Sequence, residues 1–170
     1  LDSAAASVSV CIDCVAGKYV EVAGSNAESD CIDCIAGKYS TVLSSAAEFD
    51  CIDCDRGTYV DASGSDAASD CIACAAGTYL DTAGNDEVSD CFDCARGRWV
   101  STDSNIDVSN CTACGVGTYS TTLAAWAEDL CTDCRAGTWA GTVANDAESD
   151  CIECTAGKYI HLAGSDEASD

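Results

Sequence analysis

A frame of two cysteines, one glycine and one aromatic residue returns every 20 residues along this chain. Its first copy runs from Cys11 through Cys14 and Gly17 to Tyr19, and eight copies follow one another without insertion or deletion. A fixed period of this length is the signature of an array in which neighbouring units bury a shared core. We expect residues 1–10 to be the second half of a preceding repeat and the whole to be a window on a longer array, with eight repeats at 11–30, 31–50, 51–70, 71–90, 91–110, 111–130, 131–150 and 151–170.

Large apolar side chains are too scarce to build an ordinary core. The 170 residues include 16 cysteines but only 2 Phe, 3 Trp and no Met, so cross-links would replace part of the core. Counting from the first cysteine, positions 8–13 (18–23 in the first repeat) favour β-branched residues, and positions 14–20 (24–30) are rich in turn residues. We predict a small disulfide-rich, all-β fold: an elongated solenoid or rod of 20-residue repeats, one short strand each, with essentially no helix.

The net charge and the cysteine content limit the possible partners and the cellular location. The chain carries 30 acidic against 7 basic residues, a net charge of −23, which would repel nucleic acid and acidic membrane surfaces. No apolar run is long enough to span a bilayer, so we expect no membrane insertion in this segment. The cysteine content is typical of oxidising compartments. The expected location is therefore extracellular or at the cell surface, reached through the secretory pathway.

Two columns of the repeat are nearly invariant. A position that holds only glycine usually requires positive φ or a close backbone approach, which predicts a tight turn at Gly17, Gly37, Gly57, Gly77, Gly97, Gly117, Gly137 and Gly157. Two positions later every repeat has an aromatic residue, and we expect a ladder of rings that pack over neighbouring disulfides, with glycan stacking as the alternative. The ladder comprises Tyr19, Tyr39, Tyr59, Tyr79, Trp99, Tyr119, Trp139 and Tyr159.

The paired cysteines allow three interpretations. Zinc would take the pairs two at a time and leave an alternating 40-residue signature, which is absent, and a redox motif would need a thioredoxin-like setting. Structural disulfides are favoured, either within each pair or, as uniform spacing favours, from the second cysteine of one repeat to the first of the next. The second scheme leaves Cys11 and Cys154 to pair outside the window and joins Cys14–Cys31, Cys34–Cys51, Cys54–Cys71, Cys74–Cys91, Cys94–Cys111, Cys114–Cys131 and Cys134–Cys151.

The frame Cys-x-x-Cys-x-x-Gly-(Lys/Thr)-(Tyr/Trp) over residues 11–170 resembles the ephrin-receptor-like cysteine-rich repeat and, more distantly, the first module of tumour-necrosis-factor-receptor repeats. The resemblance implies forward bonding from the second cysteine to the next repeat. Only Arg98 breaks the Lys/Thr column, and the proline that usually follows the second cysteine is absent. Long acidic arrays that look like these repeats occur in large surface proteins of algae and protists.

Ligands and modification are open alternatives. Acidic residues recur between the paired cysteines, and calcium could bridge them if they approached one another, although a solvated acidic face is the simpler reading. We expect no resident cofactor, with calcium as the weak alternative and zinc disfavoured; the calcium candidates are Asp13, Asp33, Asp53, Asp93, Asp133 and Glu153. Asn110-Cys111-Thr112 matches the N-glycosylation sequon.

The second and sixth repeats carry an aromatic residue in their otherwise polar segment. Exposed apolar clusters tend to be interfaces, so we expect lateral contacts with a partner there. The candidate residues are Leu43, Phe49, Leu123, Trp126 and Leu130. Self-association or binding to other filament or matrix subunits is the expected interaction, with glycans as a further candidate.

The function follows from the regularity. Catalysis requires one singular site, and columns that repeat eight times offer none, while the single histidine, His161, has no recurring partner. We therefore predict a non-enzymatic extracellular structural protein, a disulfide-chained rod or filament component such as a surface appendage, flagellar hair or cell-wall element. The alternative is a receptor or adhesin stalk that binds a protein or glycan.

Overall fold

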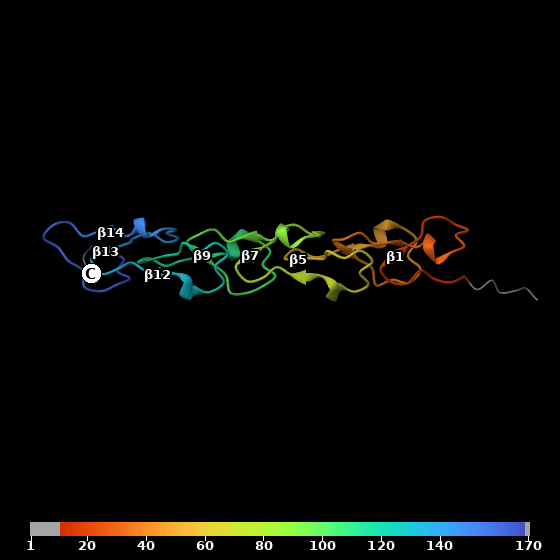
Figure 1. The fold of residues 1–170 in the computed structure, drawn as a ribbon, viewed down its shortest axis with the longest axis horizontal. Coiled ribbons are helices and arrows are strands. Elements are labelled where there is room, and N and C mark those ends of the chain that lie inside the picture. The colour runs from red at the N-terminus through yellow and green to blue at the C-terminus, as the bar shows by residue number, and fades with distance from the viewer. Residues whose placement is uncertain (1–10, 169–170) are drawn as a thin grey trace, which may run out of the picture.

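The computed structural model describes residues 11–168, which form a narrow rod (Figure 1). Residues 1–10, expected to belong to a preceding repeat, lie outside the described residues. The rod contains pairs of two-residue strands and one-turn 3-10 helices. The strands are β1 (Lys18–Tyr19), β2 (Ile32–Asp33), β3 (Lys38–Tyr39), β4 (Ile52–Asp53), β5 (Thr58–Tyr59), β6 (Ile72–Ala73), β7 (Thr78–Tyr79), β8 (Phe92–Asp93), β9 (Arg98–Trp99), β10 (Thr112–Ala113), β11 (Thr118–Tyr119), β12 (Thr132–Asp133), β13 (Thr138–Trp139) and β14 (Ile152–Glu153).

Each strand pair joins two consecutive repeats. β1 pairs antiparallel with β2, placing Lys18 opposite Asp33 and Tyr19 opposite Ile32, and the other pairs repeat this register. The expectation of a single strand over 18–23 was wrong. The strand ends after Tyr19 because the N–H of Val20 donates to the carbonyl of Ser45, 3.0 Å away, and so leaves the ladder. The second strand lies between the paired cysteines, where two residues are too few to show alternation.

The polar half of each repeat ends in a 3-10 turn, the only helical structure among residues 11–168. In the first turn, Asp30 Oδ2 accepts hydrogen bonds from the backbone N–H groups of Asn26 and Ala27, at 2.9 and 3.1 Å. This local capping explains why Asp recurs just before the cysteine. The turns are η1 (Glu28–Asp30), η2 (Glu48–Asp50), η3 (Ala68–Asp70), η4 (Val88–Asp90), η5 (Val108–Asn110), η6 (Glu128–Leu130) and η7 (Glu148–Asp150).

The core is a thin line of small side chains along the rod. It consists of cystines, glycines and the residue that follows the aromatic position in each repeat. Leu80, which is 1% exposed, is the largest fully buried residue at that position. In the second and sixth repeats that residue is a buried serine, Ser40 and Ser120. Since so little apolar surface is buried, the hydrophobic effect alone contributes modestly to each repeat.

Backbone hydrogen bonds connect each repeat to the next one. The N–H of Gly17 donates to the carbonyl of Ser40 at 2.8 Å, and the N–H of Cys34 donates to the carbonyl of Gly17 at 2.8 Å. The N–H of Ser44 donates in turn to the carbonyl of Cys14 at 3.0 Å. This pattern recurs along the rod, so the polar backbone of each repeat is satisfied largely by its neighbours.

Candidate functional site: the junction between repeats

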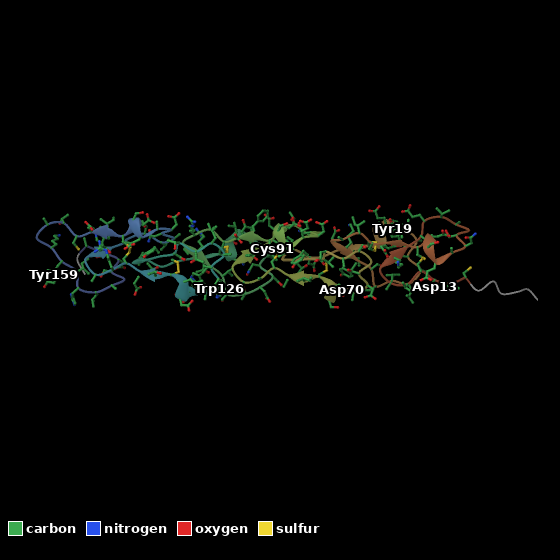
Figure 2. The ribbon with its side chains drawn as sticks, viewed as in Figure 1. Asp13, Tyr19, Asp70, Cys91, Trp126 and Tyr159 are labelled. Atoms are coloured by element: carbon green, nitrogen blue, oxygen red, sulfur yellow. A yellow bond between two sulfur atoms is a disulfide. The ribbon has the colours of Figure 1, made fainter. Side chains whose placement is uncertain are left out.

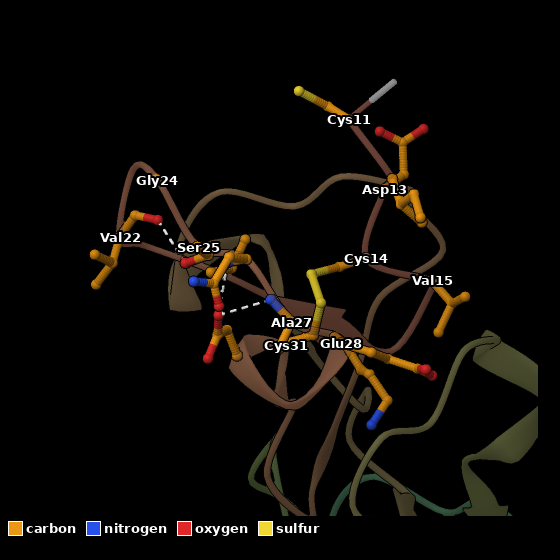
Figure 3. Close-up of a pocket in the computed structure, with 15 residues that line it drawn as sticks. Cys11, Asp13, Cys14, Val15, Val22, Gly24, Ser25, Ala27, Glu28 and Cys31 are labelled. Atoms are coloured by element: carbon orange, nitrogen blue, oxygen red, sulfur yellow. Dashed lines mark hydrogen bonds between the residues drawn. A yellow bond between two sulfur atoms is a disulfide. The ribbon is translucent and has the colours of Figure 1, made fainter. Parts of the chain in front are cut away.

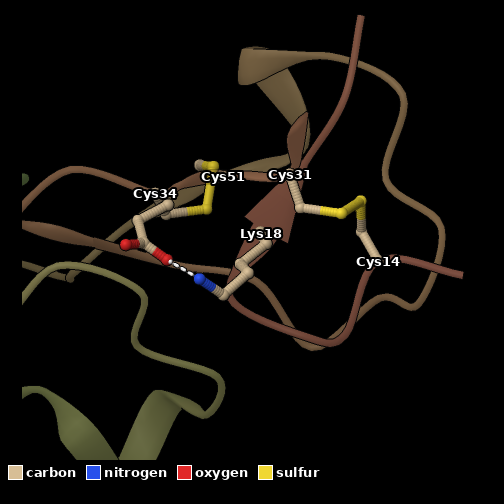
Figure 4. A network of polar contacts seen from close by, with 6 residues as sticks. Cys14, Lys18, Cys31, Cys34 and Cys51 are labelled. Atoms are coloured by element: carbon tan, nitrogen blue, oxygen red, sulfur yellow. Dashed lines mark ion pairs between the residues drawn. A yellow bond between two sulfur atoms is a disulfide. The ribbon is translucent and has the colours of Figure 1, made fainter. Parts of the chain in front are cut away.

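Every junction between consecutive repeats contains a disulfide. The described residues form Cys14–Cys31, Cys34–Cys51, Cys54–Cys71, Cys74–Cys91, Cys94–Cys111, Cys114–Cys131 and Cys134–Cys151. Figure 4 shows two successive bonds, with the strand residue Lys18 between them. Each bond joins the second cysteine of one repeat to the first of the next, the register that uniform spacing favours. Pairing of Cys11 and Cys154 outside the window stays a prediction.

The aromatic residue packs on the disulfide of the following repeats. Tyr19 contacts Cys34 and Cys51, and it is itself only 9% exposed. Burial raises the pKa of the Tyr19 phenol, and the nearby carboxylates of Glu48 and Glu21 act in the same direction. The contact recurs downstream: Tyr79 covers Cys94, Val100 and Cys111, and Tyr119 covers Cys134, Ala140 and Cys151.

The rings do not stack into a continuous ladder. Within residues 11–168 the one ring-to-ring contact joins Tyr79 to Phe92, its partner across the β7–β8 pair, at 5.7 Å between centroids. In the other strand pairs the residue opposite the aromatic residue is Ile or Thr, so the prediction of stacked rings was wrong in this respect.

The glycine column shows both positive φ and close backbone approach, the two properties that the sequence predicted as alternatives. All eight glycines have positive φ, from 74° for Gly97 to 89° for Gly77 and Gly157. Gly77 also lies so close to the rod backbone that a Cβ atom would stand 2.1 Å from the carbonyl oxygen of Ala124, two repeats downstream. Repeats therefore touch their second neighbours as well as their first, and this contact stiffens the rod.

Three of the six acidic residues between paired cysteines form ion pairs with cations of the same chain. Lys18 Nζ lies 2.6 Å from Asp33 Oδ1 (Figure 4), Lys38 pairs with Asp53, and Arg135 lies 3.0 Å from Glu153. The strand register creates the two lysine pairs, because position 8 of one repeat lies opposite position 3 of the next. Within residues 11–168 no three His, Cys, Asp or Glu side chains gather as metal ligands would. The calcium candidates are thus distributed along the rod rather than brought together.

Asp107 caps the η5 turn of the fifth repeat. Asp107 Oδ1 accepts the backbone N–H of Ser109 at 2.8 Å. That N–H and the side chain of Ser109 hold the pKa of Asp107 below its ordinary value, and desolvation opposes them. The positive charge of Arg56, in the third repeat, adds a smaller lowering of this pKa.

The lateral-contact candidates lie on the surface. Phe49 is 86% exposed and Trp126 58% exposed, while Leu43 and Leu123 are also exposed and Leu130 is half-buried. Figure 1 shows η2, which contains Phe49, at the upper edge of the rod and η6, which follows Trp126, at the lower edge. Figure 2 marks Trp126 on that lower edge. The two clusters therefore form separate patches and not one continuous face.

A surface hollow of about 660 Å³ adjoins the first disulfide (Figure 3). Cys14, Cys31, Val15 and Val22 supply apolar lining, and Asp13, Glu28 and Asp30 supply carboxylates. In Figure 3 the labelled carboxylates of Asp13 and Glu28 point away from each other. No histidine is among the residues that line this hollow.

The geometry defines a disulfide-rich tandem-repeat rod. Residues 41–91 match the sequence profile described as tyrosine-protein kinase ephrin type A/B receptor-like, a stretch that includes the Cys54–Cys71 and Cys74–Cys91 disulfides. The search of curated proteins found no significant match. The disulfides and the family match together indicate an extracellular or secreted protein. Among the described residues there is no helix with the length and apolar character of a membrane span.

Proposed function

We propose that this chain is a non-enzymatic structural segment of an extracellular rod or filament, whose disulfides carry tension along its length. One observation supports this most strongly: seven disulfides join each of the eight repeats to the next, so the second to seventh repeats are bonded to both neighbours. A binding module needs one favourable surface, whereas an unbroken chain of cross-links benefits an element that resists extension and proteolysis.

The route of force through the chain makes the proposal quantitative. A pull along the rod passes through Cys31–Cys34, crosses to Cys51 and continues through Cys54, so the loop between Cys34 and Cys51 bears no load. Three residues at roughly 3.5 Å each plus about 6 Å across the disulfide allow ~16 Å per repeat even after unfolding. Without the bonds, 20 residues would extend to ~70 Å.

Mapping the cystines under non-reducing conditions tests the covalent part of the proposal. Cleavage at acidic residues should release peptides joined as Cys14–Cys31 and Cys34–Cys51, because Asp33 and Asp53 separate the paired cysteines there. Cystines confined to Cys51–Cys54 or Cys71–Cys74 would leave the repeats unlinked and would remove the basis for tension bearing. Imaging in situ then distinguishes a continuous polymer from dispersed monomers.

Lateral association of rods is the second part of the proposal, and the two exposed aromatic patches around Phe49 and Trp126 favour it. Phe49→Ala and Trp126→Ala should weaken assembly without changing the fold, because neither side chain is buried. Val88→Ala is a matched control, since Val88 is exposed at 66% but lies in a repeat without an aromatic residue in its polar segment. Sedimentation of the variants measures the effect. Unchanged assembly in the double variant would contradict lateral binding.

A further inference from the structure

We propose that Asn110 carries an N-linked glycan on the face of the rod at the junction of the fifth and sixth repeats. The sequon Asn110-Cys111-Thr112 is the only Asn-x-Ser/Thr sequence in the chain. The inference rests on the extracellular location in the proposed function. What the structure adds is the way the junction presents this tripeptide.

Asn110 replaces the capping aspartate of the other turns and keeps its structural role. Its Oδ1 accepts the backbone N–H groups of Ile106 and Asp107 at 3.2 and 3.1 Å, just as Asp150 Oδ2 accepts those of Asp146 and Ala147. Both of these hydrogen bonds use only Oδ1 of Asn110 as the acceptor. Nδ2, the atom that is glycosylated, makes no hydrogen bond to another residue in the described part of the chain.

The two recognition residues both reach the surface. Cys111, between them, is extended, and its side chain points inward to Cys94 with 1% exposure. Asn110 ends the η5 turn and Thr112 begins β10, so the inward cysteine joins a turn residue to a strand residue. Asn110 and Thr112 are both exposed, whereas the equivalent aspartates, Asp30, Asp50, Asp70, Asp90 and Asp150, are only half-exposed.

Three departures from the repeat meet at this one junction. Arg98 is the single residue that breaks the Lys/Thr column, and its Nη1 donates to the carbonyl of Cys111 at 3.0 Å. Asn110 is the only asparagine at its position, and Thr112 stands where most repeats have Ile. Arg98 thus holds the backbone between the two sequon residues. Beside them, Ile106 and Val108 are exposed apolar residues that the first sugar would cover.

The transfer is a substitution at the anomeric carbon of a lipid-diphosphate-linked oligosaccharide, the usual donor class in the secretory pathway. A bond forms between Asn110 Nδ2 and sugar C1, and the bond between C1 and the diphosphate oxygen breaks. The lipid diphosphate leaves with the bonding pair, and one Nδ2 proton passes to a base of the transferase. No oxidant or reductant is needed.

The test is intact mass spectrometry of the full chain secreted from a eukaryotic cell, before and after peptide N-glycosidase digestion in ¹⁸O water. We expect one glycan, removed with labelled conversion of Asn110 to Asp. Asn110→Asp and Thr112→Ile should abolish it and Thr112→Ser should retain it. The first two variants restore residues used in other repeats, so their fold is secure.

A transplanted site tests whether the junction geometry suffices. Asp150→Asn combined with Ile152→Thr recreates the sequon around Cys151 and should add a second glycan. Secreted protein with intact disulfides but unmodified Asn110 would overturn the inference and leave the structural function untouched. A transplanted site that stays bare while Asn110 is modified would overturn the claim that the junction geometry suffices. Protein retained inside the cell with reduced cysteines would instead contradict the extracellular function itself.

Discussion

Gly77 lies directly against the backbone carbonyl of Ala124, two repeats further along the rod. The contact explains why this column accepts only glycine: the position combines positive φ with the absence of room for a Cβ atom. It also shows that the cooperative unit is longer than one repeat and its neighbour.

Replacing Gly77 with alanine should therefore destabilise the rod by at least about 2 kcal/mol, because left-handed backbone strain of ~1–2 kcal/mol is joined by a steric clash. Gly115→Ala is the control, because Gly115 needs no left-handed φ and no atom lies within 4 Å of the added methyl group. Thermal unfolding of both variants should show the larger loss for Gly77→Ala, and equal losses would contradict close second-neighbour packing.

Ala144 allows the opposite substitution, in which a residue with positive φ is replaced by glycine. Its φ is 60°, and its N–H donates to the carbonyl of Cys114 at 3.0 Å. The repeats with Gly64 and Gly84 at the same position use glycine in this conformation. Ala144→Gly should raise stability by about 0.5–1 kcal/mol, since relief of left-handed strain exceeds the added chain entropy. Ala147→Gly, at an ordinary φ of −148°, should not stabilise the protein.

Loss of one disulfide should weaken the rod at one junction. Exchanging Cys74 and Cys91 together for serine opens a loop with sequence separation 17 and should cost about 3 kcal/mol. Hydrogen exchange should accelerate most in the flanking repeats. Uniform acceleration from Cys14 to Cys151 would show that the array unfolds as a single unit.

Because the core is thin, core substitutions should destabilise different repeats by different amounts. Leu80→Ala removes the largest fully buried side chain and should cost about 2–4 kcal/mol. Ala140→Gly, at another position with 1% exposure in the same column, removes only a methyl group and should cost about 1 kcal/mol. Denaturant midpoints compare the two variants. A similar small loss in both would mean that the disulfides alone hold the fold.

Asp107 provides a pH-dependent readout of the η5 turn. Because its pKa is lowered in the folded chain, its ionised form stabilises the η5 turn at neutral pH, and that contribution disappears as pH falls through the lowered pKa. Arg56→Gln should raise the Asp107 pKa, as should Ser109→Ala. A carboxyl titration followed by NMR measures both shifts. A larger shift in Arg56→Gln than in Ser109→Ala would contradict the hydrogen bonds from Ser109 as the main cause of the lowered pKa.

The sequence predicted the architecture because its constraints are local and repeated. The cysteine spacing, the invariant Gly17 column and the lack of helical periodicity together indicated an elongated disulfide-rich array of short strands and turns. The strand at Ile32–Asp33 was missed because two residues carry no periodic signal. The buried position of Leu80 was missed because Ser40 and Ser120 interrupt that column; comparing it with the equally spaced aromatic column could have revealed it.

The contacts between repeats two apart could not be predicted from the sequence for a different reason. Gly77 and Ala124 meet only because two successive junctions set the direction of the chain, and no residue pattern encodes that direction. The same rotation separates η2 from η6 (Figure 1), so Phe49 and Trp126, which lie in repeats four apart, are not on one face.

Stretching a single chain by its ends, with and without reductant, tests the central claim most directly. With disulfides intact, the unfolded length should not exceed ~16 Å per repeat, because each bond bypasses the loop it closes. Reduction should lengthen each repeat to ~70 Å. An oxidised chain that extends nearly as far as the reduced one would show that the repeats are not chained through Cys14–Cys31 and its successors, and would contradict the account.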